Sequence, residues 1–271
     1  KIAKILLSLK GSKNIDNEDI NRCKNSIEIY NILVKANKKM KISVCLATFN
    51  GEKYLQQQIE SILIQLGDND ELIISDDGSS DQTLNIIESF SDKRIHIFHN
   101  KMNHGFIGNF ENALRIATGD YIFLSDQDDV WSSDKLRISL QALEKADLIV
   151  HDAEMIDGMG NSLGKNYYSM MHSGTGFLRN WLYTRFLGCC MAFNRKVLNA
   201  SLPFPKYITG HDYWIGMYAL LKFRVRFIPE RLVYYRRHGN NVSSSSEKSK
   251  NTWAYKIIIK RLGIIWALIN K

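Results

Sequence analysis

Three aspartates, Asp126, Asp128 and Asp129, fall within four residues of the segment Ser125–Trp131. They directly follow the apolar run Tyr121–Leu124, which has the length and composition of a buried strand. Like charges repel and carboxylates removed from water are costly, so acids at this position require compensation. A divalent cation is the simplest compensation, because Mg²⁺ and Mn²⁺ bind carboxylate oxygens and often take further ligands from substrate phosphates.

The three acids have different expected roles. Asp128 is predicted to ligate the cation, and Asp126 is predicted to reach the ribose side of a bound nucleotide. Asp129 is expected only to cap the helix that follows. The alternative for the whole segment is a solvated turn with a helix cap.

A second acidic turn, Asp76–Ser79, follows the apolar residues Leu72–Ile74 in the same way. A carboxylate at a strand end can accept a hydrogen bond from the imide N–H of uracil or thymine, or from a ribose hydroxyl. The alternative is that Asp76 and Asp77 merely cap the next helix. This turn is therefore a candidate nucleotide contact.

Further candidate residues lie in the second half of the chain. Asp212 opens a predicted helix and could take a proton from an attacking hydroxyl, or could only stabilise the helix dipole. His238 could be a second metal ligand, although a lone histidine in a polar loop is often a bystander. The adjacent Arg236 and Arg237 could pair with diphosphate oxygens.

Strands and helices are expected to alternate between residues 41 and 150. Short apolar runs predict strands at 42–47, 72–74, 95–98, 121–124 and 148–150. Apolar residues at spacings of three and four predict helices at 52–66, 81–90, 108–117 and 133–145. This alternation is typical of βαβ units in a mainly parallel α/β sheet, where ligands bind beyond the carboxyl ends of the strands.

The alternation stops after residue 150. Residues 153–180 show little periodicity and are expected to form a long loop or a small insertion. Further strands are predicted at 186–193, 223–228 and 232–235, and helices at 195–200, 208–222 and 252–269.

The net charge of +8 is unevenly distributed along the chain. Residues 1–40 carry +5, residues 41–204 carry −7 and residues 205–271 carry +10. A nucleic-acid-binding protein is one interpretation, but its positive charge should cover the body of the fold, which here is acidic. Basic ends around an acidic centre instead suit an enzyme at an anionic membrane surface, with no nucleic-acid partner.

The last predicted helix is basic and amphipathic. Its apolar side comprises Trp253, Ile257, Ile258, Leu262, Ile265, Leu268 and Ile269. Such a helix can lie in a membrane interface or pack on the protein. No apolar run reaches the roughly 18 residues of a spanning helix and no signal peptide is recognised, so we expect a cytoplasmic protein, at most peripheral on the inner face of the membrane.

Five motifs, in order, resemble those of the family 2 glycosyltransferases. Ser43–Asn50 is similar to the opening strand of that family, and Asp76–Asp81 to its nucleotide-binding turn. Asp126–Trp131 resembles its Asp-x-Asp metal motif. Gly210–Trp214 stands where the family places its catalytic base, and Tyr235–Val242 resembles the closing loop of bacterial surface-polysaccharide and O-antigen members.

The resemblance implies the GT-A fold, a Rossmann-like, mainly parallel α/β sheet flanked by helices. It implies a catalytic domain at 41–249, with a nucleotide-binding half at 41–130 and an acceptor half at 131–249. Outside the matched region, apolar residues at spacings of three and four predict a helical extension at 1–40, and the amphipathic helix at 250–271 follows the domain.

The resemblance also implies inverting, metal-dependent transfer of a sugar from a nucleoside diphosphate to a glycan hydroxyl. Asp212 would be the catalytic base, and Asp128 and His238 would hold Mn²⁺ or Mg²⁺. The nucleotide-sugar contacts would be Ala47, Phe49, Asp77, Asp126, Gln127, Arg236 and Arg237. Members with this acidic motif include rhamnosyl- and hexosyltransferases, so the donor would be UDP- or dTDP-linked, and the acceptor would be carried on a lipid diphosphate.

One position departs from the family pattern, because His211 stands where many members have glutamate before the base. The acceptor contact of that glutamate is therefore open. Among enzymes the alternative is a sugar-phosphate nucleotidyltransferase, which would usually have a Gly-rich, basic loop after the first strand. The segment Thr48–Lys53 contains one Gly and one Lys, which argues against it.

Overall fold

The computed structural model describes residues 40–101, 104–183, 185–206, 208–238 and 253–271. The chain divides into two compact units, Lys1–Met40 and Lys41–Lys271. The predicted N-terminal helical extension lies, apart from Met40, outside the described residues. The description below therefore concerns the second unit.

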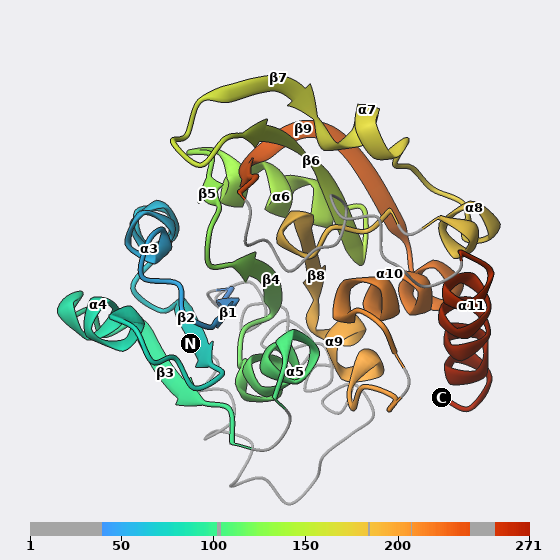
Figure 1. Cartoon of the computed structure of the whole chain (residues 1–271), viewed down its shortest axis with the longest axis horizontal. Coiled ribbons are helices and arrows are strands. Elements are labelled where there is room, and N and C mark those ends of the chain that lie inside the picture. The colour runs from blue at the N-terminus through green and yellow to red at the C-terminus, as the bar shows by residue number, and fades with distance from the viewer. Residues whose placement is uncertain (1–39, 102–103, 184, 207, 239–252) are drawn as a thin grey trace, which may run out of the picture. The chain divides into compact units, whose positions relative to one another are not determined.

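Nine strands of the described part form one sheet (Figure 1). They are β1 (Ile42–Thr48), β2 (Glu71–Asp76), β3 (Ile95–His99), β4 (Tyr121–Asp126), β5 (Val130–Trp131), β6 (Leu148–Ile156), β7 (Ser162–Asn166), β8 (Met191–Asn194) and β9 (Val225–Arg236). The order across the sheet is β3-β2-β1-β4-β8-β6-β9-β5, and β7 pairs with β6. Strands β1, β2, β4 and β6 are buried along nearly their whole length, as in sheets covered on both faces.

The predicted α/β sheet flanked by helices is confirmed, and one half of it is all parallel whereas the other half is mixed. Strands β3, β2, β1 and β4 are all parallel, and β6 and β9 are also parallel. Strand β8 runs antiparallel to both β4 and β6, and β5 runs antiparallel to β9. The parallel half therefore presents all its carboxyl ends at one edge.

Helices surround this sheet (Figure 1). They are α3 (Leu55–Leu63), α4 (Thr83–Ser89), α5 (Phe106–Ile116), α6 (Lys135–Leu143), α7 (Tyr167–Met171), α8 (Phe177–Leu182), α9 (Arg195–Ser201), α10 (His211–Lys222) and α11 (Trp253–Ile269), with a 3₁₀ turn, η1 (Gly188–Cys190). Helix α5 packs against β1 and β2, α6 packs against β6 and β8, and α10 contacts α5, α8 and α9.

Two strand predictions from the second half of the chain are wrong, and one of the two alternatives for residues 153–180 is excluded. Residues 153–180 do not form a long loop but agree with the alternative of a small insertion, because β6 continues to Ile156 and the hairpin strand β7 and helices α7 and α8 follow. The strands predicted at 223–228 and 232–235 are one strand, β9, with a bulge between them. The strand predicted at 186–193 is mostly the turn η1 followed by the shorter β8.

Helix α11 packs against α8, and the two helices lie side by side (Figure 1). The indole of Trp181 donates to the carbonyl of Arg261 at 3.1 Å, and Ile264 and Ala267 are buried. Leu262 on the same helix is 59% exposed. Packing therefore leaves one apolar side of α11 uncovered among the described residues, none of whose helices is long and apolar enough to cross a membrane.

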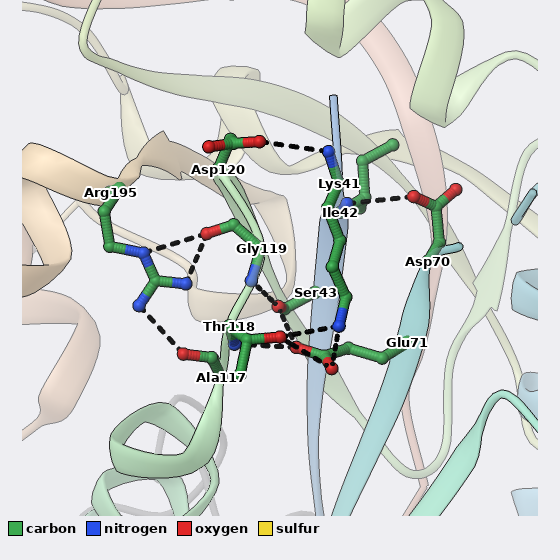
Figure 2. Close-up of polar contacts among 10 residues, drawn as sticks. All are labelled: Lys41, Ile42, Ser43, Asp70, Glu71, Ala117, Thr118, Gly119, Asp120 and Arg195. Atoms are coloured by element: carbon green, nitrogen blue, oxygen red, sulfur yellow. Dashed lines mark hydrogen bonds and ion pairs between the residues drawn. The ribbon is translucent and has the colours of Figure 1, made fainter. Parts of the chain in front are cut away.

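A buried carboxylate ties the strands together at their amino ends, opposite the candidate site (Figure 2). Glu71, the first residue of β2, accepts hydrogen bonds from Lys41 Nζ at 2.6 Å, from the Ser43 hydroxyl, and from the Thr118 N–H at 2.7 Å. Arg195 of α9 donates to backbone carbonyls of the loop that contains Thr118. Burial alone would raise the pKa of Glu71, but these hydrogen bonds outweigh it and lower the pKa to about 2.

We expect Glu71→Gln to lower the free energy of unfolding by about 2 kcal/mol at neutral pH, because it leaves buried donors without their charged acceptor. The folded-state pKa lies below the ordinary value of 4.5, so the contribution is complete above pH 4.5 and is lost as the pH falls towards 2. Denaturant unfolding at pH 7 and pH 3 measures both effects. The exposed Glu88→Gln is the matched control, and an equal loss at both pH values would contradict the prediction.

Candidate active site

The strand ends bring the two acidic turns to one edge of the sheet. Ala47 on β1 pairs with Asp126 on β4, and Thr48 pairs with Asp76 on β2. Asp126 is the last residue of β4, so the acid cluster begins where the strand leaves the sheet. The predicted alignment of the two turns at the carboxyl edge is therefore confirmed.

The three acids of the cluster have distinct surroundings. Asp126 and Asp128 are partly exposed, whereas Asp129 is fully buried. Asp129 Oδ1 accepts the backbone N–H of Arg236 at 3.0 Å. This hydrogen bond joins the segment Asp126–Asp129, called the acid loop below, to the end of β9. The prediction that Asp129 only caps the next helix is wrong, because α6 begins at Lys135 and Asp134 precedes it.

Asp128 and His238 meet at this edge although 110 residues separate them. His238 Nε2 lies 2.8 Å from Asp128 Oδ2, and their side chains are 18% and 16% exposed. A carboxylate oxygen and an imidazole nitrogen this close, and open to solvent, fit Mn²⁺ or Mg²⁺ that takes its other ligands from phosphate and water. The predicted ligand pair is thus brought together, and its metal role stays a prediction.

A second group of donor atoms includes the two aspartates on either side of Asp128 in the sequence. Asp126, Asp129 and Cys189 offer ligand atoms within 4.8 Å of one another. Burial and the neighbouring negative charges raise the pKa of the Cys189 thiol, so the sulfur keeps its proton. Sulfur is a softer ligand than Mg²⁺ and Mn²⁺ prefer, so this inner group is a poorer site for those cations than Asp128 and His238.

A buried lysine, which the sequence analysis missed, lies next to the inner group. Lys135 is fully buried, and its ammonium donates to the carbonyl of Cys189 at 2.6 Å. The same ammonium lies 4.1 Å from the ring centroid of Trp131. Burial lowers the pKa of Lys135 to about 8, and the charges of Asp129 and Asp126 oppose that shift. The chain therefore supplies one cation of its own to the acid cluster.

The predicted base lies within electrostatic reach of the cluster. Asp212, the second residue of α10, is partly exposed, and its Oδ1 accepts the Tyr213 N–H at 2.7 Å. A Cβ on Gly188 would lie 3.6 Å from Asp212 Cβ, so the turn η1 runs directly beside the aspartate. Burial, then the charge of Asp128, then that of Asp212 raise the pKa of Asp126 to about 7.

His211, beside the predicted base, is a buried neutral imidazole. Its ring stacks on Phe110 with the centroids 3.8 Å apart, and Phe106 meets it edge-on. Burial lowers the pKa of His211 to about 3, so the ring carries no charge at neutral pH. Neither ring nitrogen has a hydrogen-bond partner among the described residues. The structure gives His211 no charged role, which separates it from the glutamate of the family pattern.

The predicted nucleotide contacts hold one another in place. Phe49 is 53% exposed at the turn after β1. The side chain of Gln127 accepts the Phe49 N–H at 2.8 Å and donates to the Phe49 carbonyl at 3.0 Å. Asp77 accepts the Gly105 N–H at 2.7 Å and a hydrogen bond from Asn100 at 2.8 Å. Gln127 and Asp77 thus orient the turn and the start of α5, and their contacts to a nucleotide stay predictions.

The two arginines predicted to bind diphosphate differ in burial. Arg236 is 2% exposed, and its guanidinium donates to Gln57 Oε1 at 2.8 Å and to the carbonyl of Asp128 at 2.9 Å. Arg237 is partly exposed, and its backbone N–H donates to the carbonyl of Ile156 at 2.8 Å. These contacts turn the guanidinium of Arg236 into the protein, and the diphosphate role predicted for both arginines stays a prediction.

The family model described as "Glycosyl transferase family 2" matches residues 43–202. An uncharacterized glycosyltransferase of Nostoc sp. is 30% identical over 232 residues, which cover 78% of this chain and 70% of that protein. The UDP-Glc:alpha-D-GlcNAc-diphosphoundecaprenol beta-1,3-glucosyltransferase WfgD of Escherichia coli is 27% identical, covering 78% and 83%. The dTDP-rhamnosyl transferase RfbG of Shigella flexneri is 28% identical, covering 81% and 78%.

Two solved structures share the fold. Residues 1–349 of S. aureus TarS in complex with UDP-GlcNAc match with a TM-score of 0.65 and 22% identity, over 84% of this chain and 67% of that chain. The mannosyltransferase PcManGT from Pyrobaculum calidifontis, in complex with GDP-Man and Mn²⁺, matches with a TM-score of 0.57 and 17% identity, over 90% and 79%. The match to TarS 1–349 without a ligand covers 60% of that chain, so this chain corresponds to a part of TarS.

Proposed function

This chain belongs to glycosyl transferase family 2, and from that membership we propose that it moves a sugar, with inversion, from a nucleoside diphosphate to a glycan hydroxyl. The proposed site is the carboxyl edge of the sheet, with a divalent cation on Asp128 and His238 and with Asp212 as the catalytic base. The proposed nucleotide-sugar contacts are Ala47, Phe49, Asp77, Asp126, Gln127 and Arg237.

One observation carries this proposal. Asp128 and His238, which are 110 residues apart in the sequence, meet 2.8 Å apart close to Asp126. Asp212 lies beside Gly188 of the turn η1. The next residue of that turn, Cys189, belongs to one group of donor atoms with Asp126 and Asp129, which supports a base candidate close to the ligand pair. A nucleoside diphosphate sugar needs a cation partner for its phosphates and a base for its attacker, and this arrangement offers both.

In the proposed reaction, an acceptor hydroxyl attacks the anomeric carbon from the side opposite the diphosphate. Asp212 takes the hydroxyl proton as the new C–O bond forms. The bond from the anomeric carbon to the diphosphate oxygen breaks, and its electron pair leaves with the diphosphate, beside Arg237. Mn²⁺ or Mg²⁺ on Asp128 and His238 would supply Lewis-acid stabilisation of that leaving group. One displacement inverts the configuration of the sugar.

We propose a UDP- or dTDP-linked hexose or rhamnose as donor, and a glycan on a lipid diphosphate as acceptor, in bacterial surface-polysaccharide synthesis. The names of WfgD and RfbG support this choice, since they specify UDP-Glc with a diphosphoundecaprenol acceptor and a dTDP-rhamnosyl donor. A panel of UDP-, dTDP- and GDP-sugars with Mn²⁺, read out as release of nucleoside diphosphate and as thermal shift, tests it. A panel in which no sugar nucleotide shifts unfolding or is cleaved would refute the proposal.

We propose that the uncovered sides of α8 and α11 rest on an anionic membrane surface in the cytoplasm. Leu178 and Leu182 on α8 and Leu262, Trp266 and Ile269 on α11 are all exposed, at spacings of one helix face. Residues 250–271 contain five Lys or Arg and no Asp or Glu, and, although Arg261 is buried against Tyr213, the positive balance of the segment favours anionic headgroups. Exposed apolar side chains beside cationic ones are the pattern of interfacial helices.

We expect Leu262→Glu to weaken binding to phosphatidylglycerol vesicles about tenfold, because it removes apolar burial and adds a negative charge. Co-sedimentation with vesicles of phosphatidylglycerol and of phosphatidylcholine measures the effect. Ile64→Glu, an equally apolar and exposed position at the end of α3, is the control and should bind like the unmodified chain. Equal binding by both variants would exclude this face.

A further inference from the structure

Arg236, which is buried, donates hydrogen bonds to the acid loop from its backbone and from its side chain. Its Nε donates to the carbonyl of Asp128 at 2.9 Å, and its backbone N–H donates to the carboxylate of Asp129 at 3.0 Å. Its Nη2 donates to Gln57 Oε1 on α3 at 2.8 Å. All of these contacts lie two residues before His238, so Arg236 ties the end of β9 to the loop that carries Asp128.

The ring of Tyr54 links the same guanidinium to His238. Arg236 Cζ lies 4.5 Å from the Tyr54 ring centroid, and the Tyr54 and His238 rings lie 5.1 Å apart at an interplanar angle of 35°. A Cβ on Gly158 would lie 3.1 Å from the Tyr54 hydroxyl and 4.0 Å from His238 Cβ. The turn at Gly158 therefore confines the ring from the other side.

We propose that Arg236 and Tyr54 are positioning residues that set the His238 imidazole against Asp128, and that Arg236 is not a ligand of the diphosphate. Both members of the Asp128–His238 pair are attached to one guanidinium, Asp128 through its carbonyl and His238 through the Tyr54 ring. Arg236 is 2% exposed, and its guanidinium already donates to two protein acceptors. Few of its N–H groups are therefore accessible to a phosphate. The inference rests on the metal site of the proposed function.

The adjacent Arg236 and Arg237 allow a direct comparison of a buried and a partly exposed arginine within this chain. Successive residues at the end of a strand point to opposite sides, so Arg236 turns inward and Arg237 stays partly exposed. Arg237 thus keeps the diphosphate contact that was predicted for both. The two arginines should then respond to different ligands, the cation for Arg236 and the nucleotide for Arg237.

The test measures two affinities on the full chain, below the unfolding temperature. Mn²⁺ binding is followed by electron paramagnetic resonance of the free ion without nucleotide, and UDP binding is followed calorimetrically in EDTA. We expect Arg236→Lys to weaken Mn²⁺ binding about tenfold, as is usual when support of a ligand is lost, and to leave UDP binding unchanged. Arg237→Met should weaken UDP binding and leave Mn²⁺ binding unchanged. Arg226→Lys, an exposed arginine on the same strand, should change neither.

A second pair of variants separates positioning from folding. Tyr54→Leu removes the ring and should weaken Mn²⁺ binding about as much as Arg236→Lys does, whereas Tyr54→Phe keeps the ring and should bind Mn²⁺ normally. Lowered thermal stability with both affinities intact would overturn the proposal, as would loss of UDP binding alone in Arg236→Lys. The Tyr54 pair decides the matter even if Arg236→Lys does not fold.

A metal-free readout keeps this inference distinct from the metal proposal. The ring current of Tyr54 should shift the imidazole resonance of His238, assigned by its disappearance in His238→Asn. We expect Arg236→Lys and Tyr54→Leu to abolish that shift and Tyr54→Phe to retain it. If the unmodified chain binds no Mn²⁺ yet the shift behaves so, the metal site fails and the positioning role stands. An unchanged shift in both disruptive variants overturns the positioning role.

Discussion

Asp212→Asn should lower the rate of sugar transfer by about a thousandfold, the range expected for loss of a general base. Asparagine has the shape of aspartate, and its Oδ1 can still accept the Tyr213 N–H that Asp212 accepts at 2.7 Å. The start of α10 is therefore preserved, while the group that takes the acceptor proton is gone. Single-turnover assays with the donor identified by the sugar-nucleotide panel measure the rate, and thermal shift with UDP measures nucleotide binding.

The control for this variant is Asp134→Asn, which removes an exposed acid of a surface pair with Arg137. It should retain full activity, since exposed pairs contribute little to stability or to the site. We expect Asp212→Asn to bind UDP as the unmodified chain does. If it lost nucleotide binding but transferred sugar at a normal rate, Asp212 would not be the base.

The carboxyl edge of the sheet was predictable because two independent patterns agree there. Apolar runs of strand length predict β1, β2 and β4, and each run ends in a polar turn. Parallel strands must end at a common edge, so the turns meet whatever the detailed packing. The GT-A fold implied by the resemblance is confirmed in this way, and family membership also decides against the nucleotidyltransferase alternative.

The second half of the chain was less predictable for physical reasons. Strand β7 is exposed along almost its whole length, so it has no apolar alternation to reveal it. Strand β9 was predicted as two strands because exposed residues interrupt its apolar pattern. In the structure its register shifts where Ile228 and Arg231 pair with adjacent residues of β6, which places Pro229 in a bulge, a position that suits proline.

The sequence also did not reveal which buried residues support the site. Lys135 lies in the segment 133–145, whose spacing predicts only a helix, and lysine is almost never fully buried without a specific partner. Its partners, Cys189 and Trp131, become neighbours only when β8 and β5 join the sheet. Two adjacent arginines look equivalent in sequence, and only the direction of β9 at its end decides that Arg236 faces inward.

The negative charges of the three neighbouring acids are offset by different groups on the two sides of the cluster. Asp129 is buried and held by the backbone of Arg236, and Lys135 places a positive charge on the inner side of the cluster. The outer side, at Asp128, faces His238 and solvent. The proposed cation would therefore bind on the outer side, where the diphosphate oxygens of a donor would reach it.

That arrangement leads to the second large effect, expected for Asp128→Ala. Removing the proposed carboxylate ligand should lower metal-dependent transfer about a thousandfold, because Lewis-acid stabilisation of a leaving group is worth several kcal/mol. His238→Ala should have a smaller effect, since the charged ligand remains. Treatment of the unmodified chain with EDTA should abolish turnover, and added Mn²⁺ should restore it.

Two comparisons make the Asp128→Ala result specific to the cation. Asp68→Asn changes an exposed acid before β2, at the opposite edge of the sheet, and should leave Mn²⁺ affinity and turnover unchanged. The double variant Asp128→Ala with His238→Ala should be no worse than Asp128→Ala alone, because two ligands of one ion act as a unit and their losses do not add. Strictly additive losses would mean that Asp128 and His238 serve different ligands, and full turnover of Asp128→Ala at limiting Mn²⁺ would remove the metal from this site altogether.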